Sequence, residues 1–331
     1  MKNVTQTIGI DVSKLTLDAC IRTTAVHKQF SNDPRGFKQL ISWVIKQRLD
    51  IEETLFCFEH TGWYCLMLSY FLYDNKYDYC CINPIEIKRS MGLRRGKSDK
   101  ADAFEIANYA WLRRDELIPS IPPAKNLLEL QRMMALRDQL VKQLTACKNL
   151  NSGMHEITVN RSKDISLGIL SKSMRHLEKQ IKAVEKAMDV LISQDESMTV
   201  NYKLSKTVKG VGRVLAVQML LHTHNYSRFE SPRQFSAYCG LVPYPYQSGT
   251  SIHGRNKTHP ISDRKMKSLL SMSAISAIQH DNELKLYYKK RVEEGKPKMV
   301  VLNIIRNKIV SRVFATVNRG TPYVEINKFL A

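Results

Sequence analysis

The segment T-I-G-I-D-V-S-K-L-T-L-D-A-C-I-R, residues 7–22, contains two runs of apolar and β-branched residues with a short polar break between them. The first run reads as a strand that ends at Asp11, and Ser13 and Lys14 form a turn before a second strand. Residues 26–30 predict a third strand. The chain is therefore expected to open with an antiparallel meander.

Helical and strand patterns alternate after this meander. The predicted elements are a helix over residues 33–48, a strand over 54–62, a helix over 65–72, a strand over 77–84 and a helix over 97–114. Three strands followed by this alternation indicate an α/β domain over residues 1–120. The order is consistent with an RNase H-like fold.

A proline-rich segment, P-S-I-P-P at residues 119–123, predicts a linker after this domain. Residues 127–150 and 171–194 are rich in Leu, Lys, Glu and Met, and the second has apolar residues three and four apart. They predict an antiparallel helical pair or a short coiled coil within a middle segment, residues 121–200. Packing on its own domain and forming an oligomerising stalk both explain such a pair.

Residues 201–331 are expected to form a mainly helical third domain. The motif V-K-G-V-G at residues 208–212 predicts a hairpin between two helices, whose backbone N–H groups, with Lys209 or Arg213, could hold a phosphate. A tight helix turn explains the two glycines equally well. Near the carboxyl terminus, residues 299–320 predict an amphipathic helix that Gly320 stops.

Composition restricts the class of partner. The chain has 331 residues, 43% of them hydrophobic, so it can bury a large core. Its formal charge of +20 comes from 51 Lys and Arg residues against 31 Asp and Glu residues, spread over many segments. Such a surface favours a polyanion, most simply nucleic acid, and strongly salt-dependent binding. No apolar run approaches the roughly 20 residues of a spanning helix, so no membrane partner is expected.

The cysteines and the first residues indicate the compartment. The seven cysteines are odd in number and never form a C-x-x-C pair, so we expect reduced core residues. The chain begins with a strand-like pattern and without the features of a signal peptide. Both observations predict a cytoplasmic protein, which would associate with the nucleoid when it is active.

Four carboxylates stand at the ends of predicted elements. Asp11 ends the first strand, Glu59 ends the fourth, and Asp99 and Asp102 begin the last helix of the α/β domain. Folding would bring them together at the edge of the sheet, where carboxylate oxygens suit Mg²⁺, with Mn²⁺ as a substitute. Such ions polarise a phosphodiester and activate an attacking hydroxyl. As an alternative, Asp99 and Asp102 form an N-cap and a favourable charge at the helix start.

Basic residues immediately precede the last two acids. The candidate nucleic-acid contacts here are Lys88, Arg89, Arg94, Arg95 and Lys97. A charge run is usually a solvated face. Because this run adjoins the predicted metal cluster, where a nucleic-acid backbone would have to pass, phosphate contact is the other interpretation.

The segment Y-Q-S-G-T-S, residues 246–251, raises a similar choice for Ser248. As a serine beside a glycine, Ser248 is typical of a turn. As a nucleophile it would need a base or a metal, and nothing in the segment provides one. Activation would then come from the metal cluster of another domain or subunit. Arg255 and Lys257 follow the segment and are further candidate contacts to nucleic acid.

Taken together, these motifs resemble a known family over nearly the whole chain. I-G-I-D-V-S-K, F-E-H-T-G-W-Y, I-N-P, G-L-R-R-G-K-S-D-K-A-D, V-K-G-V-G-R-V-L-A and F-S-A-Y-C-G-L-V-P-Y-P-Y-Q-S-G-T-S-I-H-G-R occur in this order. The sequence resembles the insertion-sequence-110 family of DEDD transposases, relatives of the Piv-type DNA invertases. K-S-D-K-A-D and G-L-V-P-Y-P-Y-Q-S-G-T-S-I-H-G are its most specific parts.

The resemblance implies a RuvC-like domain whose Asp-Glu-Asp-Asp set binds Mg²⁺ and a carboxyl-terminal transposase domain with a serine nucleophile. By motif, the acids are Asp11, Glu59, Asp99 and Asp102, and the serine is Ser248. It implies donor and target DNA as partners and, in many members, a structured noncoding bridge RNA. A homo-oligomer is expected, a dimer that becomes a tetramer when two DNA partners are held together.

The sequence departs from the family pattern beside the serine. Gln247 stands where an acidic residue often precedes it, and the segment T-H-P-I-S-D-R-K-M-K-S-L-L lacks a Lys-x-Gly that commonly follows. DNA contacts after the serine are therefore expected to differ. An invertase without guide RNA, a RuvC-like structure-selective nuclease and a nucleic-acid-binding scaffold remain alternatives, which differ in whether cleavage leaves a protein–DNA adduct, free ends or no product.

Overall fold

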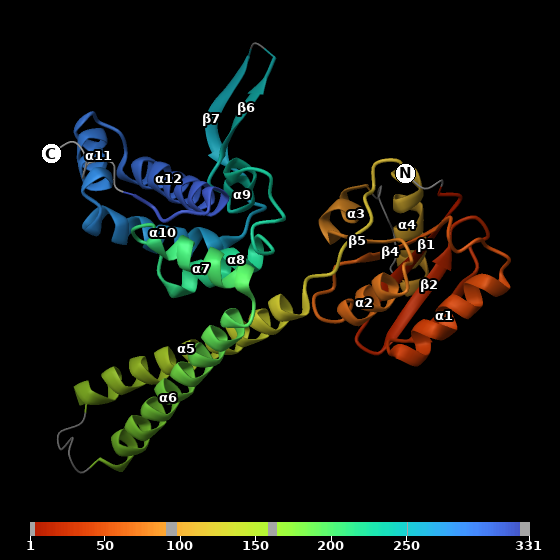
Figure 1. Ribbon diagram of the computed structural model, residues 1–331, viewed down its shortest axis with the longest axis horizontal. Coiled ribbons are helices and arrows are strands. Elements are labelled where there is room, and N and C mark those ends of the chain that lie inside the picture. Colours follow the sequence, from red (N-terminus) through yellow and green to blue (C-terminus); the bar gives the residue numbers. More distant parts are fainter. Residues whose placement is uncertain (1–3, 91–97, 158–163, 250, 325–331) are drawn as a thin grey trace. The chain divides into compact units, whose positions relative to one another are not determined.

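The computed structural model describes residues 4–90, 98–157, 164–249 and 251–324. The chain divides into two compact units, Met1–Pro122 and Pro123–Ala331 (Figure 1). The boundary falls within the predicted proline-rich linker. The further division of the second unit at residue 200 stays a prediction.

The first unit is a mixed α/β domain. Its elements are β1 (Gln6–Val12), β2 (Thr16–Ile21), β3 (His27–Ser31), α1 (Pro34–Lys46), β4 (Thr54–Glu59), α2 (Leu66–Asp74), β5 (Tyr79–Ile82), α3 (Pro84–Ser90) and α4 (Asp99–Leu112). The described strands form one sheet in the order β3-β2-β1-β4-β5. β1, β2 and β3 pair antiparallel, as the predicted meander requires, whereas β4 lies parallel to β1 and β5 parallel to β4.

Helices cover both faces of the sheet, because the central strands are apolar on both sides. On one face, Ile8 and Ile10 of β1 pack with Phe56 and Phe58 of β4 against α1 and α2. On the other face, Leu55 and Cys57 of β4 pack against Ile106, Tyr109 and Ala110 of α4. The middle of the sheet is therefore enclosed between two helical layers.

Gly9 allows α4 to lie directly on β1. A Cβ atom at Gly9 would stand 2.0 Å from the carbonyl oxygen of Ala103, which no side chain tolerates. The Thr7 hydroxyl donates a hydrogen bond of 2.8 Å to the carbonyl of Ala107, one helical turn further along α4. Since Thr7 precedes Gly9 on the strand while Ala107 follows Ala103 on the helix, α4 runs antiparallel to β1.

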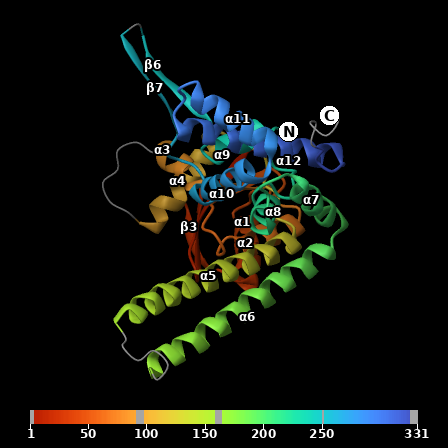
Figure 2. The same ribbon diagram turned by 90° about the vertical axis from the view of Figure 1, so that its left-hand side faces the viewer.

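The second unit begins with the predicted antiparallel helical pair, α5 (Lys125–Ile157) and α6 (Ile165–Ser193), which run side by side in Figures 1 and 2. Arg137 of α5 pairs with Glu185 of α6 at 2.7 Å, and Lys148 pairs with Glu178 at 3.3 Å. The base of the pair packs on the rest of the unit, because Leu130 and Met188 share an apolar cluster with residues of α7 and α8. The unit thus has the predicted pair packed on its own neighbours.

A helical core forms the rest of the second unit. Its helices are α7 (Glu196–Thr207), α8 (Arg213–His222), α9 (Pro232–Tyr238), α10 (Arg264–His280), α11 (Asn282–Glu293) and α12 (Lys298–Arg319). The buried face of α12 includes Val301, Ile305 and Ile309, which confirms the predicted amphipathic helix. Gly320 ends it with a φ of 69°, the left-handed conformation that glycine adopts most readily.

Two strands interrupt these helices. β6 (Pro243–Ser248) and β7 (Ile252–Thr258) pair antiparallel as a hairpin that extends away from the helices of its own unit (Figures 1 and 2). The seven cysteines are all free, and five of them are buried, in accord with the predicted reduced core residues. Within the described residues, none of the helices is long and apolar enough to span a membrane.

Candidate active site

Asp11 and Glu59 lie on neighbouring parallel strands. The register of β1 and β4, continued by one residue, sets Asp11 beside Glu59. Side chains alternate along a strand, so Asp11 shares a face with Gly9, and Glu59 shares a face with Cys57. Both belong to the α4 face, and adjacent strands are about 4.8 Å apart. The fold thus places two acidic positions next to one another, each partly exposed.

The first turn of α4 lies level with this pair. Because α4 runs antiparallel to β1 over Gly9, the Asp11 end of the strand lies beside the amino-terminal end of the helix. This end carries Asp99, which is exposed, and Asp102, which is partly exposed. The backbone therefore brings the four predicted acids to one edge of the sheet.

The alternative role of the α4 acids as caps needs a correction. Ser98, not Asp99, is the N-cap, and its hydroxyl accepts a hydrogen bond of 3.3 Å from the backbone N–H of Ala101. Asp99 is the first residue inside the helix, where its charge favours the helix dipole. The carboxylates of Asp99 and Asp102 are consequently not required as the helix cap.

The donor chemistry of these four positions fits a hard divalent cation, because Mg²⁺ prefers carboxylate oxygens. The side-chain arrangement does not yet form a coordination site. Throughout the described ranges, no group of three or more His, Cys, Asp or Glu side chains could hold a metal ion. The acids would have to turn towards a common point in order to bind one.

A fifth carboxylate on this sheet has a structural role that the sequence did not reveal. Asp18 of β2 is directly opposite Asp11 in the antiparallel register and is buried. It accepts hydrogen bonds of 3.0 and 3.2 Å from Gln29 and lies 2.9 Å from Nε2 of His27. These partners on β3 hold Asp18 in place beside the candidate site.

The predicted basic run is only partly described. Lys88 and Arg89 are exposed in the last turn of α3, where positive charge also suits the helix dipole. Arg94, Arg95 and Lys97 lie outside the described residues. The structure thus places two of these five residues, both on the surface of the unit that carries the acids, and their contact with phosphate stays a prediction.

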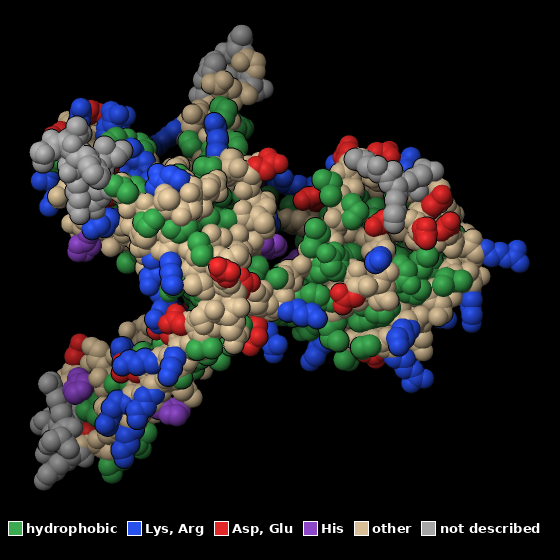
Figure 3. Space-filling model, viewed as in Figure 1, with side chains coloured by type: hydrophobic (Ala, Val, Ile, Leu, Met, Phe, Trp, Pro, Cys, Tyr) green, Lys and Arg blue, Asp and Glu red, His purple; other side chains and the backbone are tan. Residues whose placement is uncertain are grey.

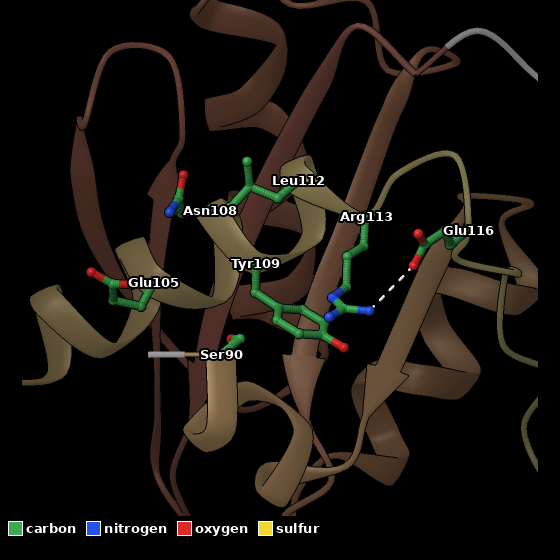
Figure 4. A pocket seen from close by; sticks show the side chains of 7 residues that line it. All are labelled: Ser90, Glu105, Asn108, Tyr109, Leu112, Arg113 and Glu116. Atoms are coloured by element: carbon green, nitrogen blue, oxygen red, sulfur yellow. Dashed lines mark hydrogen bonds and ion pairs between the residues drawn. The ribbon is translucent and has the colours of Figure 1, made fainter. Parts of the chain in front are cut away.

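A cavity that the sequence analysis missed adjoins α3 and α4 (Figure 4). It has a volume of about 300 Å³ and is lined by Ser90, Glu105, Asn108, Tyr109, Leu112, Arg113 and Glu116. Arg113 donates a hydrogen bond of 3.2 Å to Glu116, and the Tyr109 hydroxyl donates one of 3.2 Å to Glu86. Arg113 and Glu116 thus bond to one another and Tyr109 bonds to a residue outside the lining, so we assign the cavity no ligand.

Ser248 is the last residue of β6 and pairs with Ile252 across the hairpin. Gly249 follows with a φ of 55°, so the chain reverses beside the serine. The two interpretations of this position are therefore compatible: the residue borders a turn and is also carried on an extended hairpin. Apart from its strand pairing, the surroundings of Ser248 are not described.

The hairpin presents aromatic and cationic side chains. Tyr244 is 46% exposed and pairs with Lys257, while Tyr246 is 69% exposed and pairs with Gly254. A Cβ atom at Gly254 would stand 2.7 Å from the Tyr246 ring, so glycine allows the ring to lie across the strands. Arg255 is exposed as well. Exposed rings beside cations suit stacking on bases and contact with phosphates.

The two other predicted cations lie in the α7–α8 loop and at the start of α8. The loop borders a groove of about 930 Å³, to which Lys209 contributes together with the helix start at Arg213. Arg213 already pairs with Glu185 and Asp189 of α6, at 2.9 Å each. Arg213 therefore ties α8 to the helical pair, and only Lys209 of these two cations is exposed. Figure 3 shows further Lys and Arg side chains along the helical pair and over the helices of this unit.

A His–Tyr–Asp cluster connects α8, α9 and α10. His222 Nδ1 lies 3.0 Å from the Tyr238 hydroxyl, which donates a hydrogen bond of 3.2 Å to Asp263. Burial lowers the pKa of His222, although the Asp263 charge opposes this shift. Sequence analysis missed the cluster, since its three members are separated along the chain.

Comparison with known proteins identifies the family. Residues 8–154 match the model of the IS110 transposase domain with the DEDD motif, and residues 202–289 match the model of the transposase IS116/IS110/IS902 family. The chain belongs to the IS110 family of transposases. As a member of this family, it is an enzyme that cleaves and rejoins DNA.

Two relatives illustrate the range of this family. The pilin gene-inverting protein of Moraxella lacunata is 25% identical over 327 residues, which cover 96% of this chain and 97% of the relative. An IS110 insertion-element protein of Streptomyces coelicolor is 27% identical over 160 residues, 48% of this chain and 38% of the relative. The expected relation to the Piv-type invertases is thereby confirmed.

Proposed function

We propose that this IS110-family transposase recombines DNA through a site with two parts, the acids of the first unit and Ser248 of the second. The observation that carries this proposal is the convergence of Asp11, Glu59 and the first turn of α4 at one edge of the sheet. We assign the first unit an RNase H-like fold of the RuvC type. An antiparallel meander, β3-β2-β1, extended by the two parallel strands β4 and β5 supports this assignment.

The acids have the role of holding Mg²⁺ and, with it, the phosphate that is cleaved. When bound, Mg²⁺ withdraws charge from phosphate oxygens and lowers the pKa of an attacking hydroxyl. Asp11 and Glu59 are fixed by strands with buried neighbours, so they supply the rigid part of the site. Asp99 and Asp102 supply the remaining carboxylates from the helix that covers these strands.

Ser248 has the role of nucleophile. Its hydroxyl loses a proton, its Oγ forms a bond to phosphorus, and the bond from phosphorus to one sugar oxygen breaks. The released sugar oxygen ends as a hydroxyl, so atoms and charge balance. The resulting phosphoserine ester conserves the phosphodiester linkage and permits rejoining to a different strand. Exposure of the surrounding hairpin supports this role, because the serine must reach a bulky DNA backbone.

Two outcomes of recombination are open to such a site. A bridge RNA would direct insertion, and the formal charge of +20 supports the binding of RNA as well as DNA. Inversion without a guide RNA is the second candidate, and the full-length similarity to a pilin gene-inverting protein favours it. Sequencing of RNA that co-purifies with the protein distinguishes them: an enriched structured RNA encoded beside the gene supports guidance, and its absence supports inversion.

A homo-oligomer is part of the proposal, because two DNA partners must be held together during strand exchange. The helical pair supports it with exposed apolar residues, among them Leu136 and Leu150. If subunits share sites, Ser248→Ala and Asp11→Ala proteins, each inactive, will recover partial strand exchange on mixing. Absence of recovery in proven mixed oligomers would place both parts of the site within a single chain.

The cleavage assay tests the main proposal. Wild-type protein with cognate DNA and Mg²⁺ or Mn²⁺ is expected to give a covalent protein–DNA adduct on a denaturing gel. Chelator or Ser248→Ala should abolish the adduct. Cleavage to free ends by the Ser248→Ala protein would favour a structure-selective nuclease, and full activity in chelator would rule out the metal site.

A further inference from the structure

Two cations, which have no carboxylate partner among the described residues, lie where the hairpin joins the helices of the second unit. Thr258, the last residue of β7, accepts a hydrogen bond of 3.2 Å from Nζ of Lys267 on α10. Burial lowers the pKa of Lys267, and the charge of Arg306, on α12, acts in the same direction. Asn303 donates to the carbonyl of Leu241 at 2.7 Å, just before β6 begins. We call Thr258, Lys267, Asn303 and Arg306 the hairpin-base cluster.

Arg306 is the unusual member of this cluster. It is only 6% exposed and stands on the apolar face of α12, next to Ile305 and one turn after Leu302. Its guanidinium donates a long hydrogen bond of 3.4 Å to Asn303, and its Nε atom is buried without a hydrogen-bond partner among the described residues. Burial lowers the pKa of Arg306. An enclosed guanidinium in this state is costly unless an anion compensates it.

Lys267 is the more accessible cation. It is partly exposed, and its Nζ atom lies 3.8 Å from the position that a Cβ atom on Gly240 would occupy. Gly240 has a φ of 67° and leaves room for the Ser262 side chain beside it. Within the described part of the chain, neither Lys267 nor Arg306 forms an ion pair with Asp or Glu. The positive charge of Arg306 therefore disfavours the charged form of Lys267.

We propose that the hairpin-base cluster is an anion site that takes a backbone phosphate of the nucleic-acid strand lying along the β6–β7 hairpin. The guanidinium of Arg306 and the ammonium of Lys267 match phosphate oxygens in charge and hydrogen bonding. The site lies at the other end of the hairpin from Ser248. It would therefore anchor a nucleic-acid strand that continues along the hairpin past Tyr244 and Tyr246. This inference rests on the proposed role of the hairpin in holding substrate.

Binding of labelled nucleic acid over a series of salt concentrations tests the site. Every protein in this assay carries Ser248→Ala, so binding is measured without cleavage. The result therefore remains valid even if Ser248 is not the nucleophile. In this background, Lys267→Gln should weaken binding about tenfold at low salt and reduce the slope of log K against log salt by about one, the effect of losing one phosphate contact. Lys289→Gln, an exposed lysine of α11, is the matched control and should have a smaller effect.

Two probes identify the source of the phosphate. A duplex DNA and an RNA hairpin, each with a fluorescent label, are titrated separately. If the slope of log K against log salt falls by about one with either probe, the site is supported. The probe that shows this change tells whether DNA or RNA occupies the site. An unchanged slope with both probes in folded Lys267→Gln protein, or a change equal to that of Lys289→Gln, would overturn the proposal.

Arg306→Met separates anion binding from core packing. Methionine fills similar space without charge, so this variant should have a higher melting temperature than its parent in chloride buffer and should also bind the probe more weakly. Inorganic phosphate at equal ionic strength should raise the melting temperature of the parent and have less effect on Arg306→Met. A variant that melts lower in chloride and responds to phosphate like its parent would make Arg306 a structural residue and contradict the site.

Discussion

The acids of the first unit and the serine of the second stand on opposite kinds of scaffold. Asp11 is the last residue but one of β1 and Glu59 is the last of β4, each directly after a fully buried residue, and α4 lies directly on β1 at Gly9. Ser248 ends a strand of an isolated two-stranded hairpin, with Tyr246 exposed beside it. A metal site requires fixed ligand positions, whereas a nucleophile that receives large substrates benefits from an accessible support. The sheet of the first unit thus provides rigidity, and the hairpin of the second unit provides accessibility.

Removal of an acid should have the largest effect, because each of the proposed metal ligands supplies a negative charge to the cation. We expect Glu59→Ala, and equally Asp11→Ala or Asp102→Ala, to lower the rate of strand cleavage by at least about a thousandfold, the scale of losing a charge-stabilising group. Circular dichroism should show folded proteins. Asp115→Asn, in the same unit with a side chain that is 87% exposed, is the control and should cleave normally.

Gly9→Ala should disrupt the contact that positions the acids. The added methyl would stand 2.0 Å from the Ala103 carbonyl oxygen, so α4 must shift. We expect the free energy of unfolding to fall by about 3 kcal/mol. Cleavage should fall as well. Gly153→Ala, in α5 with nothing within 4 Å, is the matched control and should stabilise its helix by about 0.5–1 kcal/mol. Equal denaturation midpoints for Gly9→Ala and wild type would refute close packing at this point.

Tyr246→Ala should give the converse result in the hairpin. The ring is 69% exposed, so its removal should leave the free energy of unfolding nearly unchanged. If it stacks on a base, binding of single-stranded DNA should weaken roughly tenfold or more. Fluorescence anisotropy measures the affinity, and Tyr73→Ala, an exposed tyrosine of α2, is the comparison. A loss of stability without a loss of affinity would make Tyr246 a packing residue.

The smallest expected effect concerns the His–Tyr–Asp cluster below the hairpin. Burial lowers the pKa values of both His222 and His224 in the folded protein, with the charge of Arg228 acting in the same direction. The unfolded state therefore binds more protons below pH 6.5, the ordinary histidine pKa, and stability should fall as the pH decreases through this value.

His222→Gln should flatten this acid-side loss of stability, which urea denaturation at several pH values would measure. Asp263 and Tyr238 contact the ring, and Lys265 adds to its positive surroundings, so the variant tests the whole cluster. His176→Gln, exposed on α6, is the control. An equally steep decline in the His222→Gln protein would assign the loss to other groups.

Sequence patterns predicted the elements whose signals are local. Alternation over residues 7–22 correctly predicted β1 and β2, and Gly320 correctly predicted the end of α12. The cap was misassigned because Ser98 and Asp99 are both good cap residues and only the backbone decides between them. The β6–β7 hairpin was missed although alternation and a Ser-Gly pair marked it.

The candidate site likewise contains residues that local patterns predict and residues that they do not. Strand ends and a helix start sufficed to predict that Asp11, Glu59 and Asp102 belong to the same end of the sheet, because parallel strands share an edge. Their meeting around one metal ion stays a prediction. The isolation of Arg306 depends on which side chains surround α12, information that no local pattern contains. One signal was available: an arginine within the apolar stripe of residues 299–320 is unexpected in a packed helix.

Mapping the residue that becomes linked to DNA tests the two-part site most directly. Wild-type protein is allowed to cleave labelled DNA in Mg²⁺, the adduct is digested with protease and nuclease, and mass spectrometry locates the remaining phosphate. We predict a phosphate on Ser248, absent when Glu59→Ala protein is treated identically. Cleavage that leaves no phosphorylated residue, a phosphate on a residue other than Ser248, or an undiminished phosphate in the Glu59→Ala protein would contradict the account.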